Sequence, residues 1–289
     1  MHKYLYSLLF FLTGLSFSVK ASMPADTTKI HNQQEGVVEP PQDYKRELPA
    51  KVIHAEPLYI DLIRDLGARK GEKEWNVGFG MNPNGKGNDY EALIEYEWAP
   101  IDRLGLEVEL PFKYNFSRDP ENTEKNRMEG LKTAVQWSFF VSEKMKTTFA
   151  LGYINELEIT SLSGKESSKA IGGNTYNPFF VAAKRWGKNF HTLLYTGPMF
   201  EHDFCNQQMH TIFQINSNIH YMFGNTRHFV GLEVNQEVHN GNLETVLRPQ
   251  VRYEVSEKLM IGFVTGIPVN RVVKTPSAFF RLIYEPEHK

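Results

Sequence analysis

The stretch Leu104-Gly-Leu-Glu-Val-Glu-Leu-Pro-Phe-Lys-Tyr-Asn-Phe116 decides the fold class. Its even positions are all apolar, and most of its odd positions carry charged or polar side chains. Successive side chains of a β-strand point to opposite faces, so this alternation predicts a strand with one apolar and one polar face. The run has the ~10 residues that a tilted strand needs to cross a bilayer. Strands of ordinary globular proteins are shorter, at about five or six residues.

The same alternation recurs along the chain from Trp75 onward. It predicts about twelve strands, an even number as single-chain bacterial barrels require. We place them at 74–82, 89–98, 103–116, 129–141, 145–159, 175–185, 189–200, 207–222, 228–238, 243–255, 258–269 and 276–285. The predicted fold class is therefore all-β, a transmembrane antiparallel β-barrel over residues 74–289.

The connections between these strands alternate in length. Tight turns are expected at 99–102, 142–144, 187–188, 224–227 and 256–257, and long polar loops at 117–128 and 161–174. Outer-membrane barrels have short periplasmic turns and long outer loops, so both chain termini would lie in the periplasm. The tryptophans fall at the tight-turn ends of their strands and predict an interfacial aromatic belt: Trp75, Trp98, Trp137 and Trp186.

The N-terminal residues predict export. Lys3, the apolar run 4–19 and Val19-Lys20-Ala21 before Ser22 are typical of a cleaved signal peptide at 1–21, with an uncleaved anchor as the alternative. Residues 22–53 are polar and broken by prolines, which indicates a periplasmic linker. Localisation in the cell outer membrane follows. Partners would be outer-membrane lipid, the barrel-assembly machinery and possible small-molecule solutes. Net charge −2 gives no indication of nucleic-acid binding.

A short amphipathic helix is expected at 54–73. Pro57 suits a first helical position, and Leu58, Leu62 and Leu66 share one stripe at helical spacing. Its charged residues could enter the barrel as a plug or could contact a periplasmic partner: Glu56, Asp61, Arg64 and Asp65.

Residues His54 to Asp61 read HAEPLYID, and this stretch resembles the signature of the bacterial family named for those letters. The similarity continues through Leu62 to Gly78 and implies an outer-membrane barrel, with no activity or catalytic residue to carry over. Residues 247–253 and 260–271 are similar to the last strands of barrel transporters linked to aromatic-compound (phenol) degradation, a less specific resemblance. The chain departs from many outer-membrane barrels in lacking a terminal Phe, since it ends Glu285-Pro-Glu-His-Lys289.

Charged side chains on the inward face are the candidate selectivity residues. The alternation places an acidic stripe on the second and third strands, a basic one near the closing seam, and a Glu233–Arg248 pair across an Asn240-Gly241 hairpin turn. In a water-filled lumen such walls would orient solutes; alternatively, the charges pair and fill a narrow barrel. The residues are Glu91, Glu95, Glu97, Glu107, Glu109, Glu233, Glu237, Arg248, Arg252 and Arg281.

No arrangement of residues indicates catalysis. His239-Asn240-Gly241-Asn242 has the His and Asn of barrel phospholipases but no Ser two residues on, and no nucleophile–base pair can be assembled. His202, Asp203 and His210 suggest a solvated loop rather than a metal site, and no cofactor is expected. The sequence favours a passive channel or transporter for small solutes. The alternatives are a non-conducting structural or ligand-binding barrel and, less favoured, a lipid hydrolase.

Overall fold

A computed structural model describes residues 48–60, 62–84, 87–115, 127–159, 171–224, 226–270 and 275–286. The expected signal peptide, most of the expected linker at 22–53, Asp61 and most of the two expected long loops lie outside these residues. Within them, no helix has both the length and the apolar character needed to cross a membrane.

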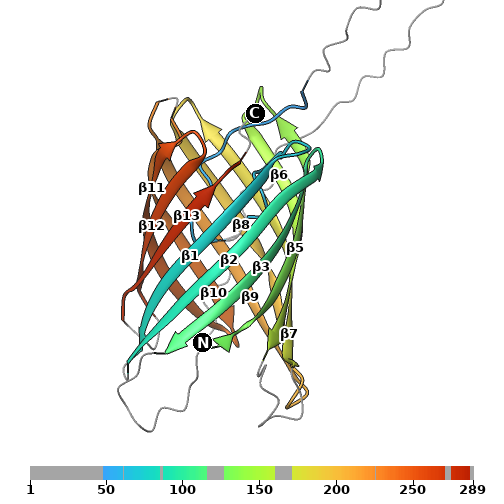
Figure 1. Ribbon diagram of the computed structural model, residues 1–289, viewed down its shortest axis with the longest axis vertical. Helices are drawn as coiled ribbons and strands as arrows, with labels where there is room; N and C mark the ends of the chain where they lie inside the picture. The colour runs from blue at the N-terminus through green and yellow to red at the C-terminus, as the bar shows by residue number, and fades with distance from the viewer. Residues whose placement is uncertain are drawn as a thin grey trace, which may run out of the picture. The chain divides into compact units, whose positions relative to one another are not determined.

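Long antiparallel strands make up most of the described chain (Figure 1). They are β1 (Lys73–Asn84), β2 (Gly87–Ile101), β3 (Leu104–Asn115), β4 (Arg127–Met128), β5 (Gly130–Ser142), β6 (Thr147–Ile159), β7 (Ile171–Trp186), β8 (Phe190–Asp203), β9 (Gln208–Met222), β10 (Phe229–His239), β11 (Asn242–Ser256), β12 (Leu259–Pro268) and β13 (Ser277–Tyr284). The expected strands are confirmed, and β7 begins earlier than predicted, inside the expected loop at 161–174.

The strands close into a barrel. Strands that follow one another in sequence pair with each other, except that β3 pairs with both β4 and β5, and β1 also pairs with β13. The two-residue β4 pairs with β3 beside the start of β5, so β4 and β5 act as one interrupted strand. The result is a closed antiparallel barrel of twelve long strands. Closure leaves no unpaired edge, which a sheet exposed to lipid requires.

The β10–β11 hairpin has the predicted turn and register. Asn240 and Gly241 have φ of 49° and 81°, as a type I′ turn requires of both central residues. His239 then pairs with Asn242, and the same register pairs Glu237 with Glu244 and Glu233 with Arg248. Asn240 is thus a turn residue, as the sequence predicted.

The two faces of the wall differ as the alternation predicts. Apolar side chains such as Ile94, Val108, Ile219, Val230 and Val251 are exposed on the outer face. Buried side chains on the inner face are largely polar or charged.

An aromatic belt surrounds one end of the barrel. Trp75, Trp137 and Trp186 are exposed at strand ends next to the tight turns. Trp75 also packs on Tyr96, with ring centroids 4.5 Å apart. Amphipathic rings collect at the membrane–water interface, so the belt marks where this end of the barrel meets one membrane surface.

Candidate functional site

Residues 48–60 and 62–72, here called the inner segment, lie inside the barrel. Several of their backbone N–H groups donate hydrogen bonds to side chains of the inner wall. Ala55 donates to His191 Nδ1 at 3.0 Å, Leu58 to Gln250 Oε1 at 2.7 Å, and Ile60 to Glu233 Oε1 at 3.2 Å. Arg64 donates to Glu97 Oε2 at 2.5 Å, and Gly67 to Ser138 Oγ at 2.8 Å. The lumen wall therefore holds the backbone of this segment.

The helix expected at 54–73 is not present: residues 54–60 and 62–72 form bends and turns. The three leucines that suggested it are all buried, but not on one face. Leu58 packs with Ala55 against Met222, Phe229 and other residues of one side of the lumen. Leu62 and Leu66 pack in a second cluster, which includes Val181 and Tyr195. The segment turns between two apolar patches, and wall side chains bond the backbone groups that a helix would pair internally.

Two glycines of the wall make room for the inner segment. A Cβ at Gly105 would lie 2.2 Å from the carbonyl oxygen of Ile63, closer than any real contact. A Cβ at Gly262 would lie 2.6 Å from a methyl group of Leu58. Both positions are in strands, where glycine often marks the close approach of another chain segment.

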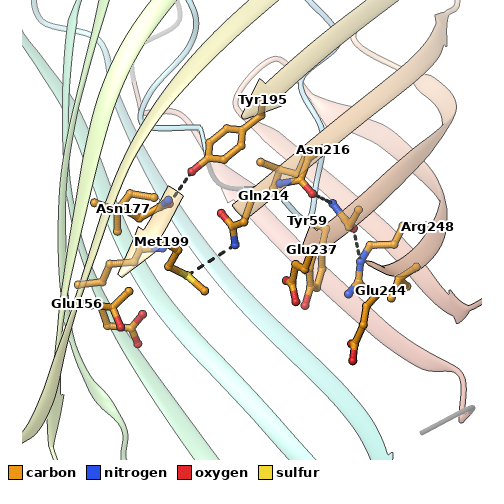
Figure 2. A pocket seen from close by; sticks show the side chains of 16 residues that line it. Tyr59, Glu156, Asn177, Tyr195, Met199, Gln214, Asn216, Glu237, Glu244 and Arg248 are labelled. Atoms are coloured by element: carbon orange, nitrogen blue, oxygen red, sulfur yellow. Dashed lines mark hydrogen bonds between the residues drawn. The ribbon is translucent and has the colours of Figure 1, made fainter. Parts of the chain in front are cut away.

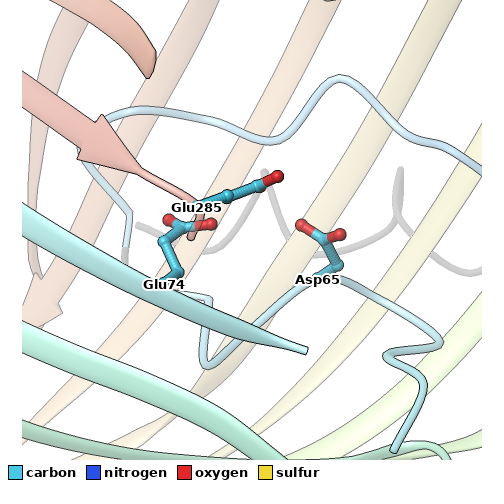
Figure 3. Close-up of side chains that lie close together, drawn as sticks. All are labelled: Asp65, Glu74 and Glu285. Carbon is cyan, nitrogen blue, oxygen red and sulfur yellow. The ribbon is translucent and has the colours of Figure 1, made fainter. Parts of the chain in front are cut away.

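Arg64 is the centre of a buried charge network on the tight-turn side of the lumen. It has a φ of 57°, a left-handed conformation uncommon for this residue type. Its guanidinium contacts Glu74, and lies 3.2 Å from Asp65 and 3.5 Å from Glu285. Asp65, Glu74 and Glu285 have carboxylate oxygens within 4.8 Å of one another (Figure 3). Arg64 supplies positive charge to all three, a role that a metal ion would otherwise take.

Two more cations extend this network. Lys51 lies 2.7 Å from both Asp65 and Glu72, and Arg227 bonds both oxygens of Glu285 at 2.9 and 2.5 Å. Burial lowers the pKa of the Lys51 ammonium, but Asp65 and Glu72 outweigh that effect and leave it above its usual value. The network ties both ends of the inner segment to the start of β1 and the end of β13.

The predicted acidic stripe is present, and much of it is paired within the wall. Glu95, Glu97, Glu107 and Glu109 are buried, and Glu91 is half-buried beside Asn82. Lys132 lies 2.6 Å from Glu109 and 3.3 Å from Glu107. Sequence reasoning had not singled out Lys132, although its place in the alternation of β5 puts it on the inner face.

The predicted basic stripe divides into two parts. Arg281 on β13 lies 3.7 Å from Glu95 on β2, because only β1 separates these two strands. Arg248 and Arg252 lie on β11, four strands from β2 around the ring. The inner segment occupies the space between, so the acidic stripe and these two arginines do not face each other across open water.

Glu233 and Arg248 are neighbours and both buried, as predicted. Asn235 links them: Arg248 Nε donates to Asn235 Oδ1 at 2.6 Å, and Asn235 Nδ2 donates to Glu233 Oε1 at 2.7 Å. Arg248 also stacks on Tyr59 of the inner segment, 3.2 Å from the ring centroid. These residues therefore hold the innermost turn of that segment.

Of the other candidate plug residues, Glu56 accepts the N–H of Leu66 at 2.9 Å, which joins the two arms of the inner segment. Asp61 lies outside the described residues. Functional residues that the sequence did not reveal are His191, Gln250, Glu74 and Ser138. Their place in the strand alternation puts them inside, but nothing local marks them as contacts of a distant segment.

Cavities lie along the lumen between the described residues. The outer cavity, of about 240 Å³, is lined by Tyr59, Glu156, Glu237, Glu244 and neighbours (Figure 2). The inner cavity, of about 470 Å³, opens near the tight turns and is lined by Lys51, Arg185 and Arg227 among others. Between them is a space of about 30 Å³ bordered by Leu58, Leu62, Arg252 and Arg281.

The closed twelve-strand ring, the apolar outer face and the aromatic belt define an outer-membrane β-barrel. The chain belongs to the HAEPLYID-like family, whose model matches residues 50–285. No curated protein sequence is significantly similar to this one.

Solved structures show the same fold at low sequence identity. An outer-membrane channel from Pseudomonas putida F1 is 11% identical with a TM-score of 0.58, over 78% of this chain and 99% of that one. The NanC porin is 9% identical with a TM-score of 0.52, over 74% of this chain and 100% of that one. The KdgM porin is 14% identical with a TM-score of 0.50, over 73% and 98% of the two chains.

Proposed function

We propose that this barrel is a passive channel for small polar solutes and that the inner segment narrows it as a plug. The observation that carries the proposal is the row of cavities: two chambers lined by polar side chains, separated by a space of about 30 Å³. A polar inner wall replaces part of a solute's hydration, as lumens of selective channels do. The fold shared with porins and a channel supports this reading.

The same narrow space favours a second candidate, a non-conducting barrel whose inner segment is structural. The Arg64 network and the two apolar clusters fix the segment to the wall on several sides. Conductance separates the two functions. A channel gives stable current steps in a planar bilayer, whereas a correctly folded structural barrel gives none.

The plug is tested by removing it. Deletion of residues 22–70 should raise single-channel conductance while the barrel keeps the heat-modifiable mobility of a folded outer-membrane protein. Unchanged conductance in a folded deletion variant would contradict the plug.

A reversible lock tests the plug in the complete chain. Because a Cβ at Gly262 would lie 3.2 Å from Leu58 Cγ, the pair Leu58→Cys and Gly262→Cys is close enough for a disulfide. In a Cys205→Ser background, oxidation should hold conductance low and reduction should restore it. Equal currents in both states would show that solutes do not pass by way of this segment.

We further propose that the tight turns are periplasmic. Cys205 is exposed in the short turn between β8 and β9, at the opposite end of the barrel from the tight turns. This native thiol should react with an impermeant reagent on intact cells, and a cysteine at Lys188 in a Cys205→Ser background should not. The reverse pattern would invert the orientation.

A further inference from the structure

Two adjacent turns at the aromatic-belt end of the barrel carry a group of lysines. Lys144 and Lys146 lie in the turn between β5 and β6, Lys184 lies near the end of β7, and Lys188 lies in the turn that follows it. The turns are neighbours because β6 pairs with β7. These four residues, here called the basic patch, place positive charge at the level where the belt marks the membrane surface.

Hydrogen bonds hold the two turns of the basic patch together. Lys146 Nζ donates to the carbonyl oxygen of Gly187 at 2.6 Å, and Lys184 Nζ donates to that of Met145 at 2.7 Å. The backbone N–H of Arg185 donates to the carbonyl oxygen of Lys146 at 2.9 Å. The lysines therefore keep a fixed arrangement without a ligand, and such preorganisation lowers the cost of binding one.

Carboxylates of the described chain do not neutralise the basic patch. Among the described residues, none of its four lysines forms an ion pair with a carboxylate. Glu143 lies in the same turn as Lys144, but its Oε1 accepts the N–H of Lys51 of the inner segment at 3.1 Å. Like charges held close together repel, and an anionic group beside them reduces this repulsion.

Lys184 brings the basic patch into contact with the lipid face. Its neighbours on β7 face inward, since Ala183 is buried and Arg185 lines the inner cavity. The alternation therefore puts Lys184 on the outer face. Its ammonium lies 5.3 Å from the ring centroid of Trp186, an exposed residue of the aromatic belt. A lysine in this position packs its methylene groups against apolar surface and extends its charge to the level of the headgroups.

A row of aromatic rings continues the lipid face from the basic patch toward the middle of the membrane. Phe139 on β5, Phe149 on β6 and Phe180 on β7 lie on the strands that the two turns follow or precede. The ring centroids of Phe139 and Phe149 are 6.3 Å apart, and those of Phe149 and Phe180 are 6.0 Å apart. This surface is apolar and adjoins the lysines, a combination that matches the acyl chains and the charged headgroup of a lipid.

We propose that the basic patch and the row of rings bind an anionic phospholipid, with the lysines facing its phosphate and the rings contacting its acyl chains. Lysines near a membrane surface attract anionic lipids, and the fixed arrangement of these four defines one position for such a lipid on the wall. The inference concerns the outer surface of the barrel and does not rest on the proposed channel function.

Tryptophan fluorescence can report on lipid at this position. The chain has four tryptophans. A full-length variant that keeps Trp186 and has Phe at the other three positions reports on the basic patch. A matched variant that keeps only Trp75, on β1, reports on a distant part of the belt.

Each variant is reconstituted at low ionic strength in phosphatidylcholine vesicles with a small fraction of bromine-labelled phosphatidylglycerol, whose bromine atoms quench nearby indole rings. The local concentration of the labelled lipid should be about tenfold higher at Trp186 than at Trp75. Labelled phosphatidylcholine should quench the two equally.

Substitution of the lysines tests their role. In the Trp186 variant, Lys184→Gln with Lys188→Gln should abolish the preference for phosphatidylglycerol. The control is Lys73→Gln with Lys258→Gln, at the start of β1 and in the turn between β11 and β12. It removes the same charge from the same end of the barrel, outside the basic patch, and should keep the preference. Heat-modifiable mobility verifies that each variant is folded.

Equal enrichment of phosphatidylglycerol at Trp186 and Trp75 would overturn the inference. So would a preference that survives the loss of Lys184 and Lys188, or one that the control also loses. Soluble glycerol phosphate should not relieve the quenching, because it has no acyl chains to contact the rings. Relief by this compound would show that the patch binds a free phosphate and not a lipid.

Discussion

Each strand of the wall pairs its backbone with neighbouring strands, whereas the inner segment pairs much of its backbone with side chains that project from those strands. The wall alternates at every second residue because lipid lies on one side and the lumen on the other. The inner segment has no such period, since its surroundings change from an apolar cluster to a carboxylate and back within a few residues. The structure of the wall is thus specified by its local sequence pattern, whereas the conformation of the inner segment is set by contacts with the surrounding barrel.

The largest effect is expected from replacing Arg64, which should release the inner segment and leave the wall folded. Replacing Arg64 with Met leaves Asp65, Glu74 and Glu285 without their shared cation, and removing one partner of a buried ion pair costs ~3–5 kcal/mol. The inner segment should lose its protection from amide hydrogen exchange, while the barrel keeps its heat-modifiable mobility. Arg69→Met is the control, because Arg69 is only half-buried and bonds a backbone oxygen. Retained protection in the Arg64 variant would show that the apolar clusters alone hold the segment.

The second prediction acts on the wall alone. The substitution Ile215→Arg, on the lipid face near the middle of β9, should destabilise the barrel by ~2–4 kcal/mol. The adjacent Gln214→Arg should be tolerated, because Gln214 faces the outer cavity and pairs in register with Glu237. Urea unfolding in lipid vesicles measures both variants. Equal destabilisation would mean that the faces of β9 are wrongly assigned.

The third prediction tests the close approach of the two regions. The Gly105→Ala variant should displace the inner segment, because its Cβ would meet the Ile63 carbonyl at 2.2 Å; overpacking of this kind costs ~1–3 kcal/mol. In Gly80→Ala the nearest atom, Glu91 Oε2, is 3.4 Å away and on a movable side chain, so that variant is the control. Proteolysis of the inner segment should increase only in the first variant.

The last expected effect is a dependence on pH. Burial, together with His191 and Arg185, lowers the pKa of His54 to about 3. A free imidazole has a pKa of ~6.5, so seating of the inner segment is fully stabilised above that pH and weakens as the pH falls toward 3, by up to ~1.4 kcal/mol per pH unit. His191 Nδ1 accepts the Ala55 N–H and could not do so once protonated.

Amide exchange of the inner segment, corrected for intrinsic rates, measures this dependence between pH 7 and pH 5. His54→Gln, which has no group titrating in that range and can still reach Thr148, should show a shallower slope. A slope that the substitution leaves unchanged would assign the effect to other groups.

The sequence predicted the wall well and the inner segment poorly. The pairing of Glu233 with Arg248 could be predicted because two turn residues set the register and every further pair follows by counting. The aromatic belt followed from strand ends. Inward and outward faces could likewise be assigned residue by residue, including those of Lys132 and Gln250, which were not recognised as contacts.

The conformation of the inner segment could not be predicted from the sequence. Leu58, Leu62 and Leu66 have helical spacing and all three are buried, yet they serve two different apolar clusters. The spacing of apolar residues indicates that a residue is buried but does not identify the residues that it packs against. An isolated helix of this length is only marginally stable in water. Only the closed barrel offers His191, Gln250, Glu233 and Glu97 as acceptors, and these residues are distant in sequence.

The inner segment enters and leaves the barrel at the same end. Lys51 donates its N–H to Glu143 in one tight turn, and Lys70 donates to Asp102 in another, while Tyr59 lies deepest between them. A loop of this kind never threads through the ring, so it can fold back into a barrel that has already closed. The barrel can therefore close before the inner segment enters it, with β1 and β13 forming their hydrogen bonds first. By the same route, the segment can leave the lumen without breaking the pairing of any two strands.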